Sequence, residues 1–548
     1  MSSSDDVLND SIVISSVGES SQKTRRDWKI LLAMGVLLAI VLRFLRIGHR
    51  EYFGDEFLTL NLLSGQRPQH FLERAIDGAT SIYHTLLTPW AAMVGTNSEG
   101  MLRLPSALFG LLACIAFFFY ARRYLRGTAR AICIIMFAMN PILVATSDSA
   151  SPYALMSLCV VMAHFFAIRS LDKGGWVNWT VYALSVVVGI LTHPLFLFVL
   201  PAHFLFALLR ARRTPKAFVV VSIVGLVALV ALAFSAVVYA QKTMPAQLNV
   251  QRPSTSELVK GLVSVVVGNF QRYERDNSND FVRGVMYIYV FICIMLSVQY
   301  YRKRTAEALA MPENVVWIDE TQDVVGRWKR LSLRAFLLFQ WFGFVIPLVG
   351  LFFLGGFVQG FRMTPEMLIL ILPPLTVLMA MGIDAAPREG ALTLGVLLIL
   401  GMAYYDVRVM KDTGYGVESA LAIVRSKDFN PDKDLLIYTE PNNIWRGIDL
   451  YKGGLPVTPI RGFNNRKEFE ERQKQIAELA PRYARIFVIY HNDRRTLGKT
   501  EARSPLREWF QASRDSGFTE IDDWKNLSEA EGTELRLYKH LAPGEQPE

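Results

Sequence analysis

Long apolar segments without charge constrain this chain of 548 residues more than any other feature. The segments 217–240 and 335–354 contain no Asp, Glu, Lys or Arg. An apolar run of about 20 residues is typical of a helix that crosses a bilayer. The sequence therefore predicts an α-helical, polytopic membrane protein, and it excludes a soluble enzyme, a secreted disulfide scaffold and a disordered protein.

Eleven membrane spans are predicted. The segment 177–209 is too long for one span, and we divide it at Thr192-His193-Pro194 because proline disfavours helix in the residue before it. The spans cover approximately residues 30–46, 104–120, 131–147, 153–168, 177–191, 194–209, 217–240, 283–301, 335–354, 365–383 and 390–406.

Loop charge predicts the orientation of these spans. The loops that this topology places inside hold 22 Lys and Arg, whereas those placed outside hold 11. Basic residues are retained on the cytoplasmic side, so we expect an inside N-terminus and an outside tail. The membrane is expected to be a bacterial inner (plasma) membrane. The net charge of +9 arises from basic residues in the short loops between apolar segments. A nucleic-acid partner is therefore not expected.

The same topology divides the chain into three parts. Residues 1–28 are predicted to be a disordered cytoplasmic leader, 29–409 a transmembrane domain, and 410–548 a small extracytoplasmic α/β domain. The transmembrane part has external loops at 48–101 and 241–282 and a cytoplasmic loop at 302–334. In the tail, short β-like runs at Leu435–Tyr438, Arg485–Tyr490 and Leu535–Tyr538 alternate with helical stretches such as Asn465–Leu479.

The first external loop carries an acidic pair, Asp55 and Glu56, shortly after the first span. Two interpretations stay open from the pattern alone. The pair could be solvated acids at a helix N-terminus, where the helix dipole stabilises carboxylates. A carboxylate at the rim of a partly dry cleft could instead act as a general base toward a hydroxyl nucleophile.

A set of short motifs follows this pair in a fixed order along the predicted topology. The motifs are Gly54-Asp55-Glu56, Trp90 with Val94–Glu99, Leu102–Gly110, Asn140-Pro141, Ser147–Leu155 and Leu372–Gly382. Through them the sequence resembles the membrane-embedded GT-C glycosyltransferases, and more narrowly the branch with protein O-mannosyltransferase-like and aminoarabinose-transferase-like enzymes.

The resemblance implies an activity for the cell envelope. Such enzymes move a sugar from a polyprenyl-phosphate carrier to a hydroxyl of a protein, lipid or glycan at the outer face, usually with inversion. The family's first-loop acid corresponds to Asp55, with Glu56 as its neighbour, and an in-line displacement also needs cations around the departing phosphate. A cofactor is not required by this chemistry, and dependence on a divalent metal stays open.

The chain departs from the family pattern in two places. Many relatives have a His-Pro-Pro-Leu-Tyr-like stretch in the first loop, where this chain has residues 79–84 with the sequence Ala-Thr-Ser-Ile-Tyr-His. Relatives also often have Glu-Ala-Arg-x-Tyr before the fourth span. Here Tyr153 is kept, serines replace the acid and the arginine, and Asp148 is the candidate for the missing carboxylate.

Two cations are candidates for the donor phosphate. Arg103 opens the second span and is either a phosphate ligand or an interfacial anchor. Arg362 is the lone cation of a short external loop. Arg272 and Arg275 are interpreted as a solvated cluster, and the histidines His84 and His193 as structural.

A second class of function is a non-catalytic membrane protein or transporter. Asp55 and Glu56 would then be coupling or gating acids. Transporters place ionisable groups near the middle of the membrane, whereas this pair lies in a loop beyond a span. The loop position favours the enzyme.

Overall fold

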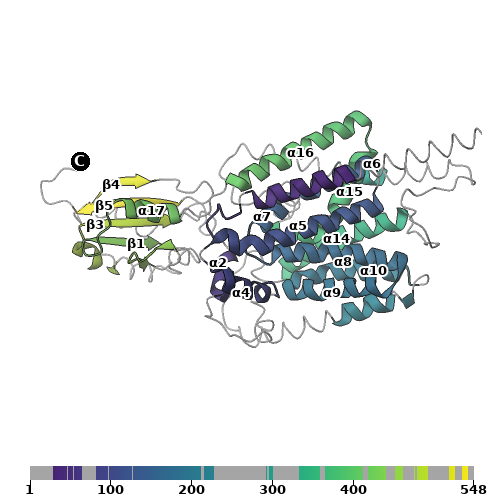
Figure 1. Cartoon of the computed structure of the whole chain (residues 1–548), viewed down its shortest axis with the longest axis horizontal. Helices are drawn as coiled ribbons and strands as arrows, with labels where there is room; N and C mark the ends of the chain where they lie inside the picture. Colours follow the sequence, from purple (N-terminus) through teal and green to yellow (C-terminus); the bar gives the residue numbers. More distant parts are fainter. Residues whose placement is uncertain are drawn as a thin grey trace, which may run out of the picture.

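The protein is described by a computed structural model (Figure 1). The described residues are 29–45, 47–52, 55–63, 82–96, 98–125, 127–211, 215–216, 218–227, 292, 295–299, 333–357, 365–411, 417–439, 451–460, 474–475, 478–491, 518–524 and 533–540. Helices form one large bundle, and five strands with one helix form a separate sheet layer at one end of it.

The bundle is built from apolar helices that match the predicted spans closely. Residues 29–44 are helical, and the labelled helices that follow are α5 (Glu99–Tyr124), α6 (Gly127–Ala138), α7 (Pro141–Ser147), α8 (Tyr153–Lys173), α9 (Trp176–Thr192), α10 (Leu200–Leu209), α14 (Leu333–Phe357), α15 (Leu372–Ala385) and α16 (Arg388–Lys411). Among the described residues, four helical segments are long and apolar enough to cross a membrane, and five further apolar helices are shorter. The chain is an integral membrane protein; the predicted spans at 217–240 and 283–301 lie largely outside the described residues.

The predicted break at Thr192-His193-Pro194 is present. Helix α9 ends at Thr192, and a 3₁₀ helix, η1 (Pro194–Val199), leads into α10. The His193 side chain caps this turn, because its Nδ1 accepts the N–H of Leu195 at 3.2 Å. Beyond the break, the hydroxyl of Tyr182 in α9 lies 3.3 Å from Nδ1 of His203 in α10, and this side-chain contact joins the two helices.

The predicted span 131–147 differs in detail from the observed helix. It is divided into α6 and α7 at Asn140, whose side chain accepts the N–H groups of Ile142 and Leu143. Asn at the cap followed by Pro141 at the first helical position is a strong helix start. The span 365–383 likewise begins with a 3₁₀ helix, η3 (Pro365–Ile371), before α15.

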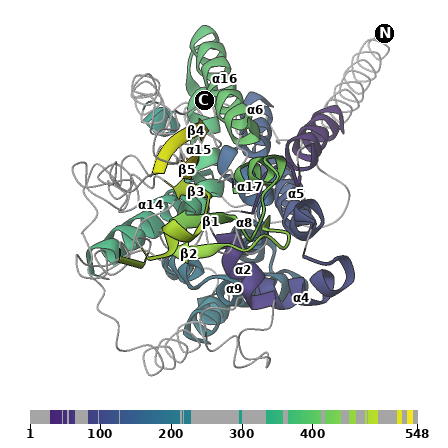
Figure 2. The same cartoon turned by 90° about the vertical axis from the view of Figure 1, so that its left-hand side faces the viewer.

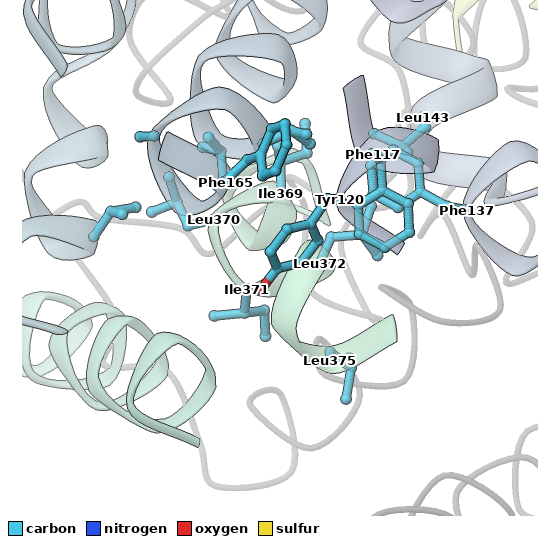
Figure 3. Close-up of a cluster of buried hydrophobic side chains, with 14 of the residues drawn as sticks. Phe117, Tyr120, Phe137, Leu143, Phe165, Ile369, Leu370, Ile371, Leu372 and Leu375 are labelled. Carbon is cyan, nitrogen blue, oxygen red and sulfur yellow. The ribbon is translucent and has the colours of Figure 1, made fainter. Parts of the chain in front are cut away.

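Helix α15 forms the centre of the bundle. Every side chain from Leu372 to Ile383 is buried, as expected for a helix that is apolar on all sides. Figure 3 shows the residues at its beginning packed against aromatic side chains of α5, α6 and α8. Phe117 stacks on Phe137 with ring centroids 3.8 Å apart, so this part of the core is tightly packed.

The tail contains a mixed five-stranded sheet in the order β2-β1-β3-β5-β4. Strands β1 (Asp434–Thr439), β2 (Thr458–Ile460) and β3 (Arg485–His491) are parallel, and β5 (Thr533–His540) is antiparallel to β3 and to β4 (Phe518–Trp524). Alternate residues face opposite sides, and α17 (Val417–Ser426) packs on the side with Leu436 and Phe487. The boundary at residue 410 stays a prediction.

The sheet lies beyond the end of the bundle that carries two short helices, α2 (Asp55–Leu63) and α4 (Ile82–Val94) (Figures 1 and 2). These helices belong to the predicted first external loop. The acidic pair is therefore at the junction between the membrane bundle and the tail.

Candidate active site

The loop that leaves the first span is pressed against the beginning of α5. Gly48 has a φ of +87°, and a Cβ added there would lie 2.8 Å from the backbone of Gly100. Only glycine accepts both the left-handed backbone and this close approach. The approach fixes residues 47–52 beside α5 before the acidic pair is reached.

Helix α2 buries one face. Glu56, Thr59 and Leu62 occupy that face at helical spacing and are all buried. Asp55 is the first residue of α2, so its backbone is placed at the helix N-terminus. The position of its side chain lies outside the described structure.

Glu56 and Arg103 form a fully buried ion pair, and both side chains have 0% exposure. The guanidinium Nε and Nη2 of Arg103 donate to the two oxygens of Glu56 at 2.8 and 2.9 Å. This two-pronged geometry is the strongest that a carboxylate and a guanidinium form. Arg103 also donates to the carbonyls of Arg50 at 2.7 Å and Glu51 at 3.0 Å.

A third segment joins the pair from the turn between α7 and α8. The N–H of Ala150 donates to Oε1 of Glu56 at 2.8 Å. Arg50 bridges the same parts, because its Nη2 lies 3.8 Å from Oε2 of Glu56 and donates to the carbonyl of Asp148 at 2.9 Å. One carboxylate thus ties together α2, α5 and this turn.

The charge state of Glu56 follows from these contacts. Burial by itself would raise the pKa of Glu56, but the attraction and hydrogen bonds of Arg103, helped by Arg50 and the Ala150 N–H, hold it below its usual range. Glu56 is therefore ionised at neutral pH. Both oxygens of this carboxylate accept hydrogen bonds, from Arg103 and from the Ala150 N–H.

Neutral hydrogen bonds extend the network on the other side of Glu56. The Thr59 hydroxyl donates to the carbonyl of Ala150 at 2.7 Å and lies 3.1 Å from Nε2 of His84. Because that hydroxyl has only one hydrogen, Nε2 of His84 must be the donor between them. Burial lowers the pKa of His84 to about 4, so the ring is neutral.

A tyrosine of α4 completes the contact between α4 and α5. The Tyr83 hydroxyl is 2.8 Å from Oγ of Ser106, and Oγ of Ser106 is 3.5 Å from the carbonyl of Ser151. Oγ of Ser151 is buried without a hydrogen-bond partner among the described residues.

The structure brings together some of the predicted site residues. Glu56 and Arg103 contact each other, and Asp148 lies close enough to Arg103 to interact with its charge. Tyr153 begins α8 near this turn, and its ring centroid is 5.8 Å from that of His193. Arg362 lies outside the described residues, as do Arg272 and Arg275.

Sequence reasoning did not identify Arg50, Thr59, Tyr83 or Ser106 as members of this site. Thr59 had a detectable signal, since it follows Glu56 at the i, i+3 spacing of a helix face. The others meet only through tertiary packing. No group of three or more His, Cys, Asp or Glu side chains that could hold a metal ion occurs among the described residues.

Comparisons with known proteins agree with the sequence resemblance. Residues 83–239 match the family model described as dolichyl-phosphate-mannose-protein mannosyltransferase. No curated protein sequence matches the chain.

Solved structures give the fold. ArnT from Cupriavidus metallidurans bound to undecaprenyl phosphate is similar to this chain with a TM-score of 0.50 and 11% identity, covering 94% of this chain and 99% of that one. For the apo state of ArnT the TM-score is 0.49 and the sequence identity 12%, and the match covers the same 94% of this chain and 99% of that one. For the Archaeoglobus fulgidus oligosaccharyltransferase tethered with an acceptor peptide, the TM-score is 0.43 and the sequence identity 12%. That match covers 85% of this chain and 69% of the other.

Proposed function

From its resemblance to the membrane-embedded GT-C glycosyltransferases, which the family model over residues 83–239 and the fold of ArnT support, we propose that this chain is a glycosyltransferase. It transfers a sugar from a polyprenyl-phosphate donor to a hydroxyl of a protein, lipid or glycan at the outer face of a bacterial inner membrane. The undecaprenyl phosphate named for ArnT supports this class of donor.

The observation that places the proposed site in the first loop is the buried Glu56–Arg103 pair at the start of α2. Its contacts fix the first turn of α2 against α5 and the α7–α8 turn, and Asp55 is the residue beside Glu56 in that turn. Catalysis by a base requires such a fixed position, because a displacement of about 1 Å can cost about 100-fold in rate. Glu56 and Arg103 are then positioning residues.

The proposed reaction is one displacement. Asp55 takes the proton of the acceptor hydroxyl as its oxygen attacks the anomeric carbon. The bond from that carbon to the phosphate oxygen breaks, and the carrier phosphate leaves with the electron pair. A single displacement inverts the anomeric configuration.

Charge develops on the departing phosphate, and a cation is needed near it. Arg103 is occupied by Glu56 and two backbone carbonyls in the described structure. Arg362 is therefore our candidate for direct contact with the phosphate. Asp148 and Tyr153 border the α7–α8 turn and are proposed to contact substrate.

A transporter is the alternative function, with Asp55 and Glu56 as coupling acids. A coupling acid must change its protonation state during transport. Glu56 is held ionised by Arg103, so its environment does not support that role.

The reaction class is tested with purified full-length protein in lipid nanodiscs. Synthetic polyprenyl-phosphate sugars are added with a membrane lipid and glycan extract as the acceptor source. We expect release of free polyprenyl phosphate that depends on the acceptor. Release that never occurs with any donor of a panel of hexoses and pentoses would contradict the proposal.

A further inference from the structure

One tyrosine of the tail contacts both the first loop and α5. The Tyr451 hydroxyl accepts the backbone N–H of Tyr52 at 2.9 Å and donates to Oε1 of Glu99 at 2.8 Å. Tyr52 belongs to the loop and Glu99 to the first turn of α5. One hydroxyl group therefore joins two parts of the membrane domain to the tail.

A second contact lies beside it. The carboxylate of Glu51 accepts the N–H groups of Val417 at 3.0 Å and Glu418 at 2.8 Å, which begin α17. The guanidinium of Arg425, further along α17, donates to the carbonyl of Tyr451. Tyr451 and the α17 N-terminus are thus parts of the same tail structure, and both hold residues 51–52.

Residues 50–52 are also the segment on which Arg103 depends. The carbonyls of Arg50 and Glu51 accept from Arg103, and Arg103 in turn holds Glu56. Glu99 precedes Arg103 by one helical turn of α5. Tyr451 therefore sets the position of the loop backbone relative to the helix that carries Arg103.

We infer that Tyr451 is a positioning residue of the proposed transferase site, through which the tail holds the loop with Asp55 and Glu56 against α5. This inference rests on the proposed function for its effect on catalysis. Burial and the nearby carboxylates raise the pKa of Tyr451 above its usual range, so the hydroxyl stays protonated and able to donate.

The first test measures amide hydrogen exchange in the full-length protein. Tyr451→Phe keeps the ring and removes both hydrogen bonds, so the Tyr52 amide should exchange about tenfold faster, as expected for one lost hydrogen bond. Tyr483→Phe removes a hydroxyl from the same domain, on the other face of the sheet, and is the matched control. Unchanged exchange at Tyr52 in Tyr451→Phe would overturn the inference.

The second test separates turnover from binding. Tyr451→Phe should lower kcat about tenfold and leave the affinity for undecaprenyl phosphate within about twofold. Glu99→Gln keeps an acceptor oxygen and should retain activity, whereas Glu99→Ala should resemble Tyr451→Phe. A wild-type kcat in Tyr451→Phe would contradict a positioning role.

The two measurements distinguish the two ideas. If the wild-type protein shows no sugar transfer but the Tyr52 amide exchanges faster in Tyr451→Phe, the proposed function is wrong and the contact between tail and loop is confirmed. If transfer occurs and neither kcat nor exchange changes in Tyr451→Phe, the inference fails alone.

Discussion

Glu51 and Glu56 lie on the same loop, and both are buried, but they respond to burial in opposite ways. Burial raises the pKa of Glu51 to about 7, and the backbone N–H groups of α17 offset only part of that rise. The Arg103 guanidinium keeps the pKa of Glu56 below its usual range in spite of complete burial.

The difference shows what stabilises a buried carboxylate. A helix N-terminus supplies partial positive charge, which compensates a small part of the lost hydration. A bidentate guanidinium supplies a full charge and two hydrogen bonds. The loop therefore has a firmly charged end at Glu56, beside the proposed base, and a titratable end at Glu51, beside the tail.

Of the changes that test the contrast between Glu51 and Glu56, removal of Arg103 should cause the largest loss of stability. Arg103→Ala leaves the Glu56 charge buried without its partner, which should destabilise the protein by about 3 to 5 kcal/mol. Sugar transfer should be lost as well. Thermal unfolding in nanodiscs measures the loss of stability.

A second ion pair in the chain offers a control. Arg485 donates to Asp434 in the same bidentate manner, but its side chain is 29% exposed. Arg485→Ala should cost about 1 to 2 kcal/mol, because Asp434 is 1% exposed beneath a partly exposed arginine, and truncating that arginine opens the carboxylate to water. Equal losses in both variants would mean that burial does not distinguish the two pairs.

The pH dependence of Glu51 should have the next largest effect. Its ordinary pKa is 4.5 and its pKa in the fold is about 7, so the folded protein binds the proton more tightly than the unfolded chain. Stability from this group is then complete below pH 4.5 and falls as the pH rises through 7, by at most about 3 kcal/mol. The pH dependence of stability has the opposite sign for Glu56. Its contribution is lost only as the pH falls through its lowered pKa.

The measurement compares melting temperatures at pH 5.5 and 8. Wild-type protein should lose more stability on going to pH 8 than Glu51→Gln does, because the amide cannot ionise. The neighbouring titratable groups, Glu418 and Tyr451, are common to both proteins. The same pH dependence in both would show that Glu51 is not the titrating group.

Thr59 should have the smallest effect of the three. Thr59→Val keeps the shape but leaves the Ala150 carbonyl and the His84 N–H without this partner, at a cost of about 1 to 2 kcal/mol. Thr59→Ser keeps the hydroxyl and should retain most of the stability. If Thr59→Val lost as much stability as Arg103→Ala, the neutral hydrogen bonds of Thr59 would contribute as much to the stability of the site as the Glu56–Arg103 ion pair does.

Those apolar spans that fall within the described part of the chain could be predicted within a few residues. Uncharged runs have no stable alternative to a membrane helix, so length and hydropathy decide them. The break at His193 followed from Pro194, and the break at Asn140 carried a comparable signal in Asn140-Pro141 that the span prediction did not use.

The site could be predicted only in part. The position of Asp55 and Glu56 in the first loop is a local feature, and the sequence shows it. The partner of Glu56 is set by tertiary packing, since Arg103 and Ala150 come from distant segments. Contact with the tail through Glu51 and Tyr451 has no local signal in either segment.

The most direct test of the account is the rate of sugar transfer in a single turnover by Asp55→Asn. The amide keeps the shape of the side chain, so the protein should fold and bind the proposed polyprenyl-phosphate donor within about twofold of wild type. Loss of a general base should lower the transfer rate by at least about 100-fold. A folded Asp55→Asn protein that transfers sugar at the wild-type rate would contradict the role of this loop in catalysis.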